Sequence, residues 1–492
     1  MTGATDPQTE FSHKDILSII FGLMLAMFLA ALDQTIVATA LPTIGFDLGD
    51  VVNLSWVVTA YLLASTTVTP LYGKLSDIHG RGPVLLIAIA LFSIGSLVCA
   101  VSQSMSMLIF ARVLQGLGGG GLISLAQTII ADVISPRERG RYQAYIASVF
   151  AVASIAGPLI GGVMAQHIHW SLIFWINLPL GLAAFLVMRR MLSRLPHYGR
   201  QHSLDAVGCV LMVIASVAFL LALGWGGVRF AWASVEIVSL FGISLVATAL
   251  FVWRMLTAAE PFLPLSLLAD PVVGPATAAA FLVYGTMIAL TIMVPLYFET
   301  ARGMSASEAG MALMPQMACT VIGAVMGGRC MARFEHYKRP GVAGLAASVV
   351  ALAILAMLPE QVSLLPKIPL FMIMGVGMGM ILPMTTVCIQ NAVPMHQLGT
   401  ATGVSNFFRA LGGAVMVAVL GAVLMSALGA GATGDIAELT RGVDTAVLHH
   451  AFSWAFATAA AAQAIGLACL LSMRQLPLRT SVREEAETVG AE

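Results

Sequence analysis

Apolar stretches long enough to cross a bilayer recur along the whole chain, separated by short segments that are polar or contain Pro and Gly. A membrane helix needs about 20 mostly apolar residues. Fourteen segments meet this requirement, centred near Met27, Leu63, Phe92, Leu122, Ala153, Leu180, Val213, Leu245, Met287, Val321, Ala351, Met374, Met416 and Ala462. The pattern predicts an all-α integral membrane protein with fourteen transmembrane helices.

The basic residues are distributed unequally between the two sets of connecting segments. The N-terminus, the even-numbered loops and the C-terminus hold eighteen of the twenty-four Lys and Arg residues, and the odd-numbered loops hold four. Because cytoplasmic loops retain Lys and Arg, we expect both termini to be cytoplasmic and the chain to lie in the inner (plasma) membrane. The first apolar stretch is too long for a signal-peptide core and has no cleavage-site pattern, so it is expected to remain as the first helix.

Composition agrees with this class. Hydrophobic residues make up 59% of the chain and charged residues 10%, whereas an ordinary soluble domain is about 25% charged. The net charge is zero, so no bulk field attracts nucleic acid. The six cysteines are scattered without a CxxC pair or a His/Cys cluster, and neither a metal site nor another cofactor is expected.

The chain contains an internal repeat. A shift of 259 residues places Gly116 on Gly375 and Gly140 on Gly399 without a gap. Two similar halves imply a pseudo-two-fold axis along the membrane normal, with a site between the halves. The predicted parts are an N-terminal six-helix bundle (1–200), two inserted helices (201–260), a C-terminal six-helix bundle (261–475) and a cytoplasmic tail (476–492).

Two charges interrupt the apolar stretches of the first half. Asp33 lies in the middle of the first stretch and Arg112 within the fourth. A charge at the bilayer centre costs roughly 2.5–3.5 kcal/mol on insertion scales, so each is expected to face water or a partner. The repeat places Phe371 opposite Arg112. Either one copy diverged, or the coupling chemistry belongs to the first half. An acid and a base in one apolar bundle predict proton-driven transport.

The segment Gly73–Gly82 after the second span is predicted to be a tight loop, with glycines such as Gly73 and Gly80 adopting backbone angles that other residues avoid. Asp77 and Arg81 in this loop are expected to pair with charges or helix ends and to act as a gate. A plain loop that retains positive charge would explain Arg81 but neither Asp77 nor the glycines. The second-half counterpart has Ala332 in place of Asp77, so its gate is expected to be looser.

The fifth span contains Gly157-Pro158 followed by Gly161-Gly162. Proline bends a helix, and flanking glycines let a neighbouring helix fill the bend. Four residues are expected to line the substrate cavity: Gln34, Tyr61, Gln115 and Asn406. Gln115 lies three positions after Arg112 and therefore shares its helix face.

With these stretches in order, the chain resembles the major facilitator superfamily, and within it the fourteen-span drug:proton antiporters. The resemblance extends from the first span to the last and is carried by Leu32–Val37, Gly73–Gly82, Arg112–Gly120 and Gly157–Gly162. It implies a transporter rather than an enzyme. It also implies that Asp33 and Arg112 are the proton-linked acid and base, and that the Pro158 stretch marks an exporter.

Several points stay open at this stage. Glu299 replaces the glutamine that is usual in the family, either as a second protonatable residue for proton coupling or as an acid at the membrane interface. Arg409 either lines the cavity or extends to the cytoplasmic edge. The cargo is expected to be a drug or another hydrophobic or amphipathic small molecule. A dedicated exporter of one siderophore, amino acid or self-made antibiotic is the alternative, and an importer is a more distant one. A periplasmic adaptor protein is a further partner that the sequence leaves open.

Overall fold

The computed structural model describes residues 13–50, 53–192, 204–358, 365–428 and 443–480. Within these ranges the chain is helical and contains no β-strand beyond one isolated bridge. The long helices are α1 (His13–Asp47), α2 (Ser55–His79), α3 (Arg81–Ala100), α4 (Met105–Val133), α5 (Pro136–His167), α7 (Asn177–Leu192), α8 (Ala206–Trp225), α9 (Val235–Thr257), α11 (Val273–Arg302), α12 (Ala306–Arg333), α13 (Lys338–Met357), α14 (Ile368–Ala392), α15 (Leu398–Ala427) and α17 (Thr445–Ser472). Short helices, α6 (Leu172–Trp175) and α10 (Leu265–Ala269), and the 3-10 turns η1 (Leu365–Lys367) and η2 (Met395–Gln397) lie between them.

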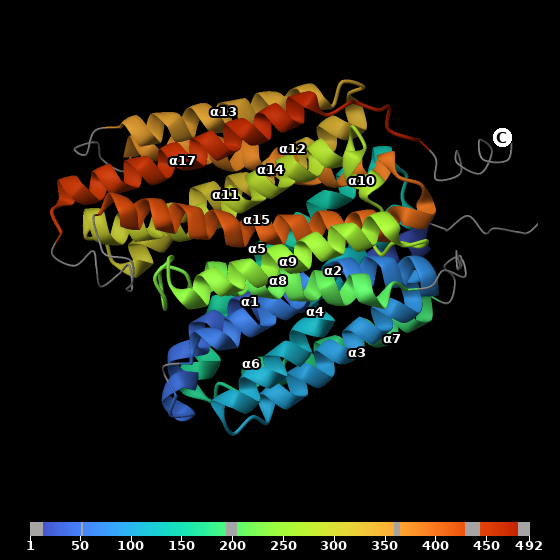
Figure 1. Ribbon diagram of the computed structural model, residues 1–492, viewed down its shortest axis with the longest axis horizontal. Coiled ribbons are helices and arrows are strands. Elements are labelled where there is room, and N and C mark those ends of the chain that lie inside the picture. Colours follow the sequence, from blue (N-terminus) through green and yellow to red (C-terminus); the bar gives the residue numbers. More distant parts are fainter. Residues whose placement is uncertain (1–12, 51–52, 193–203, 359–364, 429–442, 481–492) are drawn as a thin grey trace, which may run out of the picture.

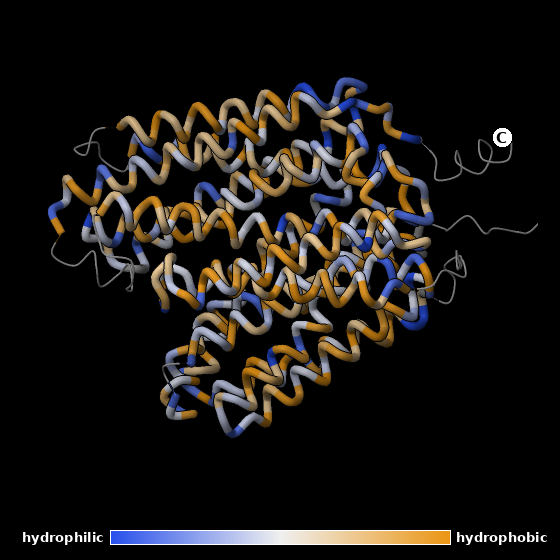
Figure 2. The backbone as a smooth tube through the Cα atoms, viewed as in Figure 1, coloured by the Kyte–Doolittle hydropathy of each residue, from blue (hydrophilic) through white to orange (hydrophobic). Residues whose placement is uncertain are grey.

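Thirteen of the described helical segments are long and apolar enough to cross a membrane by length and composition. The remaining long helix is α2, which is less apolar because Ser, Thr and Tyr residues interrupt it. Figure 2 shows hydrophobic residues along the lengths of the helices and hydrophilic residues gathered toward their ends. The predicted all-α membrane fold is confirmed.

The helices form two groups whose internal contacts repeat (Figure 1). In the first group α1 packs on α5 and α7, α2 on α4, and α3 on α4 and α7. In the second group α11 packs on α15 and α17, α12 on α14, and α13 on α14 and α17. Each contact between two helices of the first group has a counterpart in the second group, between the helices whose labels are higher by ten. The repeat in the sequence predicts this correspondence. The pair α8 and α9 packs together, and α8 contacts both α2 and α15.

The two groups meet mainly through α2 with α15 and through α5 with α12. At both crossings the backbones come into contact, because a Cβ atom at Gly73 would collide with the Gly399 carbonyl oxygen and one at Gly328 with that of Gly140. Small residues are the usual means by which membrane helices approach so closely.

The predicted loop Gly73–Gly82 is wrong in extent. Helix α2 continues through Gly73 and Asp77 to His79, and α3 begins at Arg81, so only Gly80 connects them. Gly80 has φ 88°, a conformation that costs glycine little and other residues more. Gly73 is helical and serves helix packing. A single glycine inside a helix does not end it when the flanking residues favour continuation.

Candidate functional site

The two charged residues expected in the membrane interior meet inside the first group of helices. Arg112 on α4 donates from Nη1 to Oδ2 of Asp33 on α1 at 2.7 Å. Both side chains are enclosed, with 0% of Asp33 and 1% of Arg112 exposed. The guanidinium also donates from Nε to the Val57 carbonyl oxygen at 2.9 Å, and its Cζ lies 4.3 Å from the Tyr61 ring centroid. A buried charge is tolerated when it is paired and hydrogen-bonded, so each residue accounts for the burial of the other.

Two amides complete the hydrogen bonding of the Asp33 carboxylate. Gln115 donates from Nε2 to Asp33 Oδ1 at 2.8 Å, while its Oε1 accepts from Arg112 Nη1 at 2.6 Å. Asn177 on α7 donates to the same Asp33 oxygen at 3.2 Å. Ser96 Oγ accepts from both amides, at 3.2 and 3.0 Å. An ionised Asp33 carboxylate therefore has one cation and two amide donors around it.

Glycines bring the helices close enough for this cluster to form. A Cβ atom at Gly95 on α3 would collide with the backbone of Gln115 on α4. One at Gly116 would collide with the backbone of Tyr61 on α2. These glycines thus let the neighbouring helices pack closely and bring the residues of the polar cluster together.

The residues predicted to line a cavity lie in different surroundings. Gln115 and Tyr61 are buried in the cluster, with 0% and 1% exposed, and do not face an open surface. Gln34 is exposed, next to Asp33 along α1. Glu299 is exposed near the end of α11 and does not belong to the cluster. Asn177 was absent from the predicted site, although an amide before Leu-Pro in an apolar stretch was the available signal.

A second charged cluster lies at one end of the two groups. Arg81 donates from Nε to Asp132 at 2.8 Å, from Nη1 to Asp77, and from Nη2 to the Met395 carbonyl oxygen at 3.2 Å. The three charged side chains are at most 7% exposed. Asp132, at the end of α4, was not predicted as part of this site because it is distant from Arg81 in the sequence.

Asp77 also caps a helix of the opposite group. Its Oδ1 accepts from the Gly399 N–H at 3.0 Å, and its Oδ2 accepts from the Thr400 N–H and hydroxyl at 2.7 and 2.6 Å. Both residues are in the first turn of α15, where N–H groups lack acceptors within the helix and the helix dipole is positive. The carboxylate therefore joins α2 to α15.

The Gly157-Pro158 stretch lies against α1 just beyond Asp33. The Thr35 hydroxyl donates to the Ala153 carbonyl oxygen of α5 at 2.9 Å, in the turn that precedes Pro158. Helix α5 continues through this proline.

The glycines around Pro158 are not equivalent. A Cβ atom at Gly157 would collide with the Thr35 side chain, and one at Gly161 would collide with the Ile36 carbonyl oxygen. At Gly162, however, an added Cβ would meet no atom within 4 Å. The predicted packing through Gly161 is present, and that through Gly162 is wrong.

A polar contact crosses between the groups farther along α15. Asn406 donates from Nδ2 to Gln127 Oε1 on α4 at 2.9 Å. Gln390 on α14 donates from Nε2 to Thr402 Oγ1 at 3.2 Å and to the Gln127 carbonyl oxygen at 3.4 Å. Asn406, which was expected to line the cavity, thus lies where the two groups meet.

Arg409 follows Asn406 by one helical turn. Arg409 lies eleven residues after Leu398, where α15 starts. At 1.5 Å per residue this is roughly 17 Å along the helix. Its Nη1 donates to Asn406 Oδ1 at 3.4 Å, and its Cζ lies 4.8 Å from the Tyr284 ring centroid. Of the two interpretations left open, the structure favours a position inside the protein over extension to the cytoplasmic edge.

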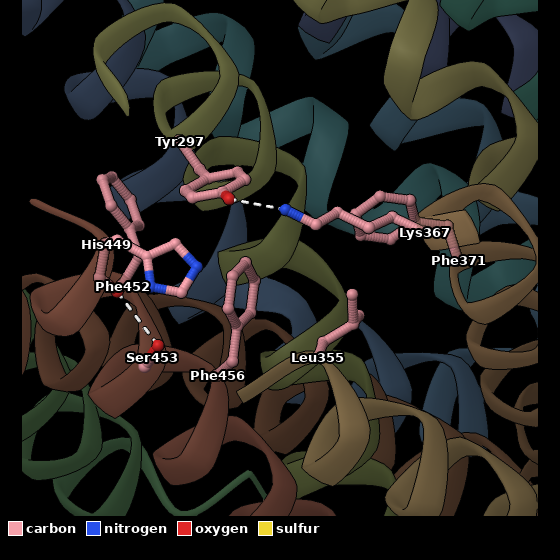
Figure 3. Close-up of a pocket in the computed structure, with 8 residues that line it drawn as sticks. All are labelled: Tyr297, Leu355, Lys367, Phe371, His449, Phe452, Ser453 and Phe456. Carbon is pink, nitrogen blue, oxygen red and sulfur yellow. Dashed lines mark hydrogen bonds between the residues drawn. The ribbon is translucent and has the colours of Figure 1, made fainter. Parts of the chain in front are cut away.

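A small pocket lies between α11, α13, α14 and α17 (Figure 3). Lys367, only 2% exposed, donates from Nζ to the Tyr297 hydroxyl at 2.7 Å. Apolar and aromatic side chains form the other walls, among them Phe371 and Phe456, and His449 borders the Tyr297 ring. The pocket lies in the second group of helices, whereas Asp33 lies in the first.

The part of the chain that the structure describes contains no set of ligands for a metal ion. No group of three His, Cys, Asp or Glu side chains there is arranged to hold a metal ion, and the six cysteines are free.

Two matched groups of apolar helices, with a buried ion pair in one and polar contacts between them, define a multi-pass membrane transporter that acts on small molecules. The model of the Major Facilitator Superfamily matches residues 23–417, and the chain belongs to that family. The family consists of transporters rather than enzymes, so the resemblance in the sequence is confirmed.

Similar proteins come from bacteria and fungi. The multidrug transporter protein MdtP of Bacillus subtilis is 34% identical over 82% of this chain and 75% of its own length. The efflux pump dotC of Dothistroma septosporum is 35% identical over 82% of this chain and 71% of its own. An uncharacterized MFS-type transporter of Mycobacterium tuberculosis is 32% identical over 96% and 72% of the two chains.

Solved structures with the same fold are more distant in sequence. A bacterial homologue of the iron transporter ferroportin in its outward-facing state has a TM-score of 0.65 at 12% identity, with 93% of this chain and 99% of that chain covered. The human organic anion transporter MFSD10 has a TM-score of 0.62 at 17% identity, with 92% and 99% covered. At these identities the likeness shows the fold alone.

Proposed function

We propose that the protein is a proton-coupled antiporter that exports drugs or other hydrophobic or amphipathic small molecules by alternating access. The observation that carries the proposal is the buried pair of Asp33 and Arg112, a titratable acid held by a cation within the membrane interior. The relatives named multidrug transporter and efflux pump support the cargo class and the direction.

Protonation of Asp33 would change the hydrogen bonding of the whole cluster. A neutral carboxylic acid is a weaker partner for a guanidinium than a carboxylate is. Arg112 would then be a buried cation without a counter-charge, and loss of one partner from a buried pair costs about 3–5 kcal/mol. The bundle can lower this cost by a rearrangement that brings Arg112 to water or to another acceptor. In this way a proton drives a conformational change.

Helix α2 connects the cluster to the gate. Arg112 contacts α2 through the Val57 carbonyl oxygen and the Tyr61 ring, and Asp77 is farther along the same helix. Val57 and Asp77 are twenty residues apart in α2, or about 30 Å along a helix. A displacement of α2 at Arg112 therefore changes how Asp77 meets the first turn of α15.

We infer that the Asp77 end is cytoplasmic, since the Lys and Arg distribution predicts cytoplasmic termini and even-numbered loops in the plasma (inner) membrane. In the described state this end is held closed by the capping contacts of Asp77 and the glycine contacts beside it. Cargo exchange with the cytoplasm requires these contacts to separate.

The energy of one proton suffices for efflux. A single charge that moves down 100 mV releases about 2.3 kcal/mol. At about 1.4 kcal/mol per tenfold change in concentration ratio, this supports roughly 40-fold accumulation of a neutral cargo.

The test is a transport assay in proteoliposomes with an imposed pH gradient and a panel of chemically unrelated dyes and drugs. An antiporter should release protons down their gradient when cargo is added on the side opposite the protons. An importer would move cargo in the same direction as protons. A response to one compound class alone would favour the dedicated exporter, and no proton movement with any cargo would contradict the proposal.

A further inference from the structure

Arg409, which is half-buried, differs from Arg112 and Arg81 in its charge balance. Arg112 is paired with Asp33, and Arg81 is paired with Asp77 and Asp132. Arg409 forms no salt bridge with any carboxylate of the residues that the structure describes. A cation within the membrane interior without a counter-charge is costly, so an anion that reaches it would be bound favourably.

The contacts of Arg409 leave one edge of the guanidinium without an acceptor. The Tyr284 ring lies 4.8 Å from Cζ, and Nη1 makes the long hydrogen bond of 3.4 Å to Asn406. Nε is enclosed by the protein and has no hydrogen-bond partner, and the described contacts of the side chain include none at Nη2. The Nε–Nη2 edge is one of the geometries in which arginine donates two parallel hydrogen bonds to a carboxylate, sulfonate or phosphate.

The surroundings of Arg409 combine polar and apolar groups. Asn406 joins α15 to Gln127 of the opposite half, so Arg409 lies one turn from a contact between the halves, where a shared site is expected. One turn along α11 from Tyr284, Met287 and Ile288 are half-buried. Flexible and branched apolar side chains there suit the hydrophobic body of a small molecule.

We propose that Arg409 binds an anionic group of the cargo, so that the preferred cargo is an amphipathic monoanion with a carboxylate or sulfonate on a hydrophobic body. This inference rests on the proposed function for its transport role, whereas the binding site stands on the geometry alone. Tyr284 and Asn406 are positioning residues that hold the guanidinium plane.

The charge of the cargo sets how transport depends on membrane potential. Exchange of one proton for a monoanion moves two charges, whereas exchange for a neutral molecule moves one. If a given potential multiplies the accumulation ratio of a neutral cargo by a factor, it multiplies that of a monoanion by the square of this factor. A preference for anions would therefore make efflux strongly dependent on potential.

The binding test uses two dyes that differ by a single sulfonate. These are 8-anilinonaphthalene-1-sulfonate, a monoanion, and the neutral N-phenyl-1-naphthylamine. Equilibrium affinities are measured on the purified full chain without a pH gradient. The wild type is expected to bind the sulfonate at least tenfold more tightly than the neutral dye. Equal affinities in the wild type would overturn the proposal, and this comparison needs no variant.

Variants then assign the preference to Arg409. Arg409→Gln should lower sulfonate affinity about tenfold or more and leave the neutral dye unaffected, while Arg409→Lys should retain part of the preference because the charge remains without the fork. The matched control is Arg229→Gln, which removes an exposed arginine that also contacts aromatic rings and should change neither affinity. Sulfonate binding that survives Arg409→Gln, or an equal loss for both dyes, would overturn the assignment.

The transport arm separates the two proposals. In proteoliposomes with a valinomycin-imposed potential, the sulfonate should respond with the square of the factor seen for the neutral dye. Anion binding through Arg409 without proton-coupled movement of either dye would contradict the proposed antiport and leave the binding site standing. Proton-coupled movement of both dyes with an equal response to potential would contradict the anion preference and leave the antiport standing.

Discussion

Gly140 and Gly399 occupy equivalent positions of the two halves, and each packs its backbone against a glycine of the opposite half. Gly140 meets Gly328, and Gly399 meets Gly73. The two crossings are therefore matched in packing, yet they differ in charge. Asp77 caps α15 beside Gly73, whereas Ala332 follows Gly328 and only its carbonyl oxygen accepts a hydrogen bond, from Arg137 at 3.3 Å. One crossing is fixed by a carboxylate and packing, the other mainly by packing.

Asp77→Asn should destabilise the closed state of this end. An amide offers one acceptor oxygen and no charge to the first turn of α15, and the loss of such a charged cap is worth about 1–2 kcal/mol. We expect turnover to fall roughly tenfold with little change in cargo affinity, as initial rates over a range of cargo concentrations would show. Ala332→Ser, at the equivalent position of the other crossing, is the control and should be nearly silent. A variant with weakened cargo affinity and normal turnover would remove Asp77 from the gate.

Asp33→Asn should abolish proton-driven transport and leave the protein folded, because the amide keeps the shape of the side chain but cannot titrate. Uptake of cargo into inverted vesicles under a proton gradient measures this. Glu236→Gln, an exposed acid in the first turn of α9, is the matched control and should behave as wild type. Retention of most activity in Asp33→Asn would exclude Asp33 as the coupling acid, and Glu299→Gln would then test the second protonatable residue.

The sequence predicted the parts of the site that are costly in a membrane. Asp33 and Arg112 are charges within apolar stretches, and the insertion penalty alone shows that each requires a partner. Ser96 carries no such penalty, so nothing marked it before the helices were placed side by side, and Asn177 was marked only by its amide in an apolar stretch. Asp132 was visible as an acid at a span end, but its pairing with Arg81 depends on the packing of α3 against α4.

Exposure was harder to predict than helix position. The spacing of Arg112 and Gln115 correctly placed them on one helix face, but a helix face does not say whether it meets a cavity or another helix. Gln115 proved to be a hydrogen-bond donor to Asp33. The loop at Gly73–Gly82 was overestimated for a related reason, because glycine serves both turns and close packing. Within this segment, only Gly80 has the positive φ that a turn requires.

Arg112→Lys should support transport only weakly. The guanidinium donates to Asp33, Gln115 and the Val57 carbonyl oxygen at once, and a lysine ammonium cannot reproduce this planar set. Hydrogen bonds to charged groups contribute about 1.5–3 kcal/mol each, so a rate at least tenfold lower is expected, with a larger loss in Arg112→Ala. Expression and thermal unfolding in detergent are measured beside proton-coupled uptake. A loss of uptake that only follows a loss of folded protein would indicate a structural role.

Gly157 and Gly162 offer a matched pair of substitutions on one helix. Gly157→Val should disrupt the contact of α5 with Thr35, because a β-branched side chain cannot enter the space beside that residue. At Gly162 an added Cβ atom would meet no atom within 4 Å, so Gly162→Val serves as the control. Since the contact lies two residues from Asp33, its disruption should let protons pass without cargo, and Pro158→Ala should do so to a smaller extent.

The measurement is the decay of a preset pH gradient in proteoliposomes without cargo. Gly157→Val should dissipate the gradient several-fold faster than wild type, whereas Gly162→Val should hold it as wild type does. Equal decay in the two valine variants would mean that bulk on α5 rather than contact with α1 matters. Gradients held by Gly157→Val and Pro158→Ala alike would reduce this stretch to ordinary helix packing, and the exporter assignment would lose its main support from the sequence.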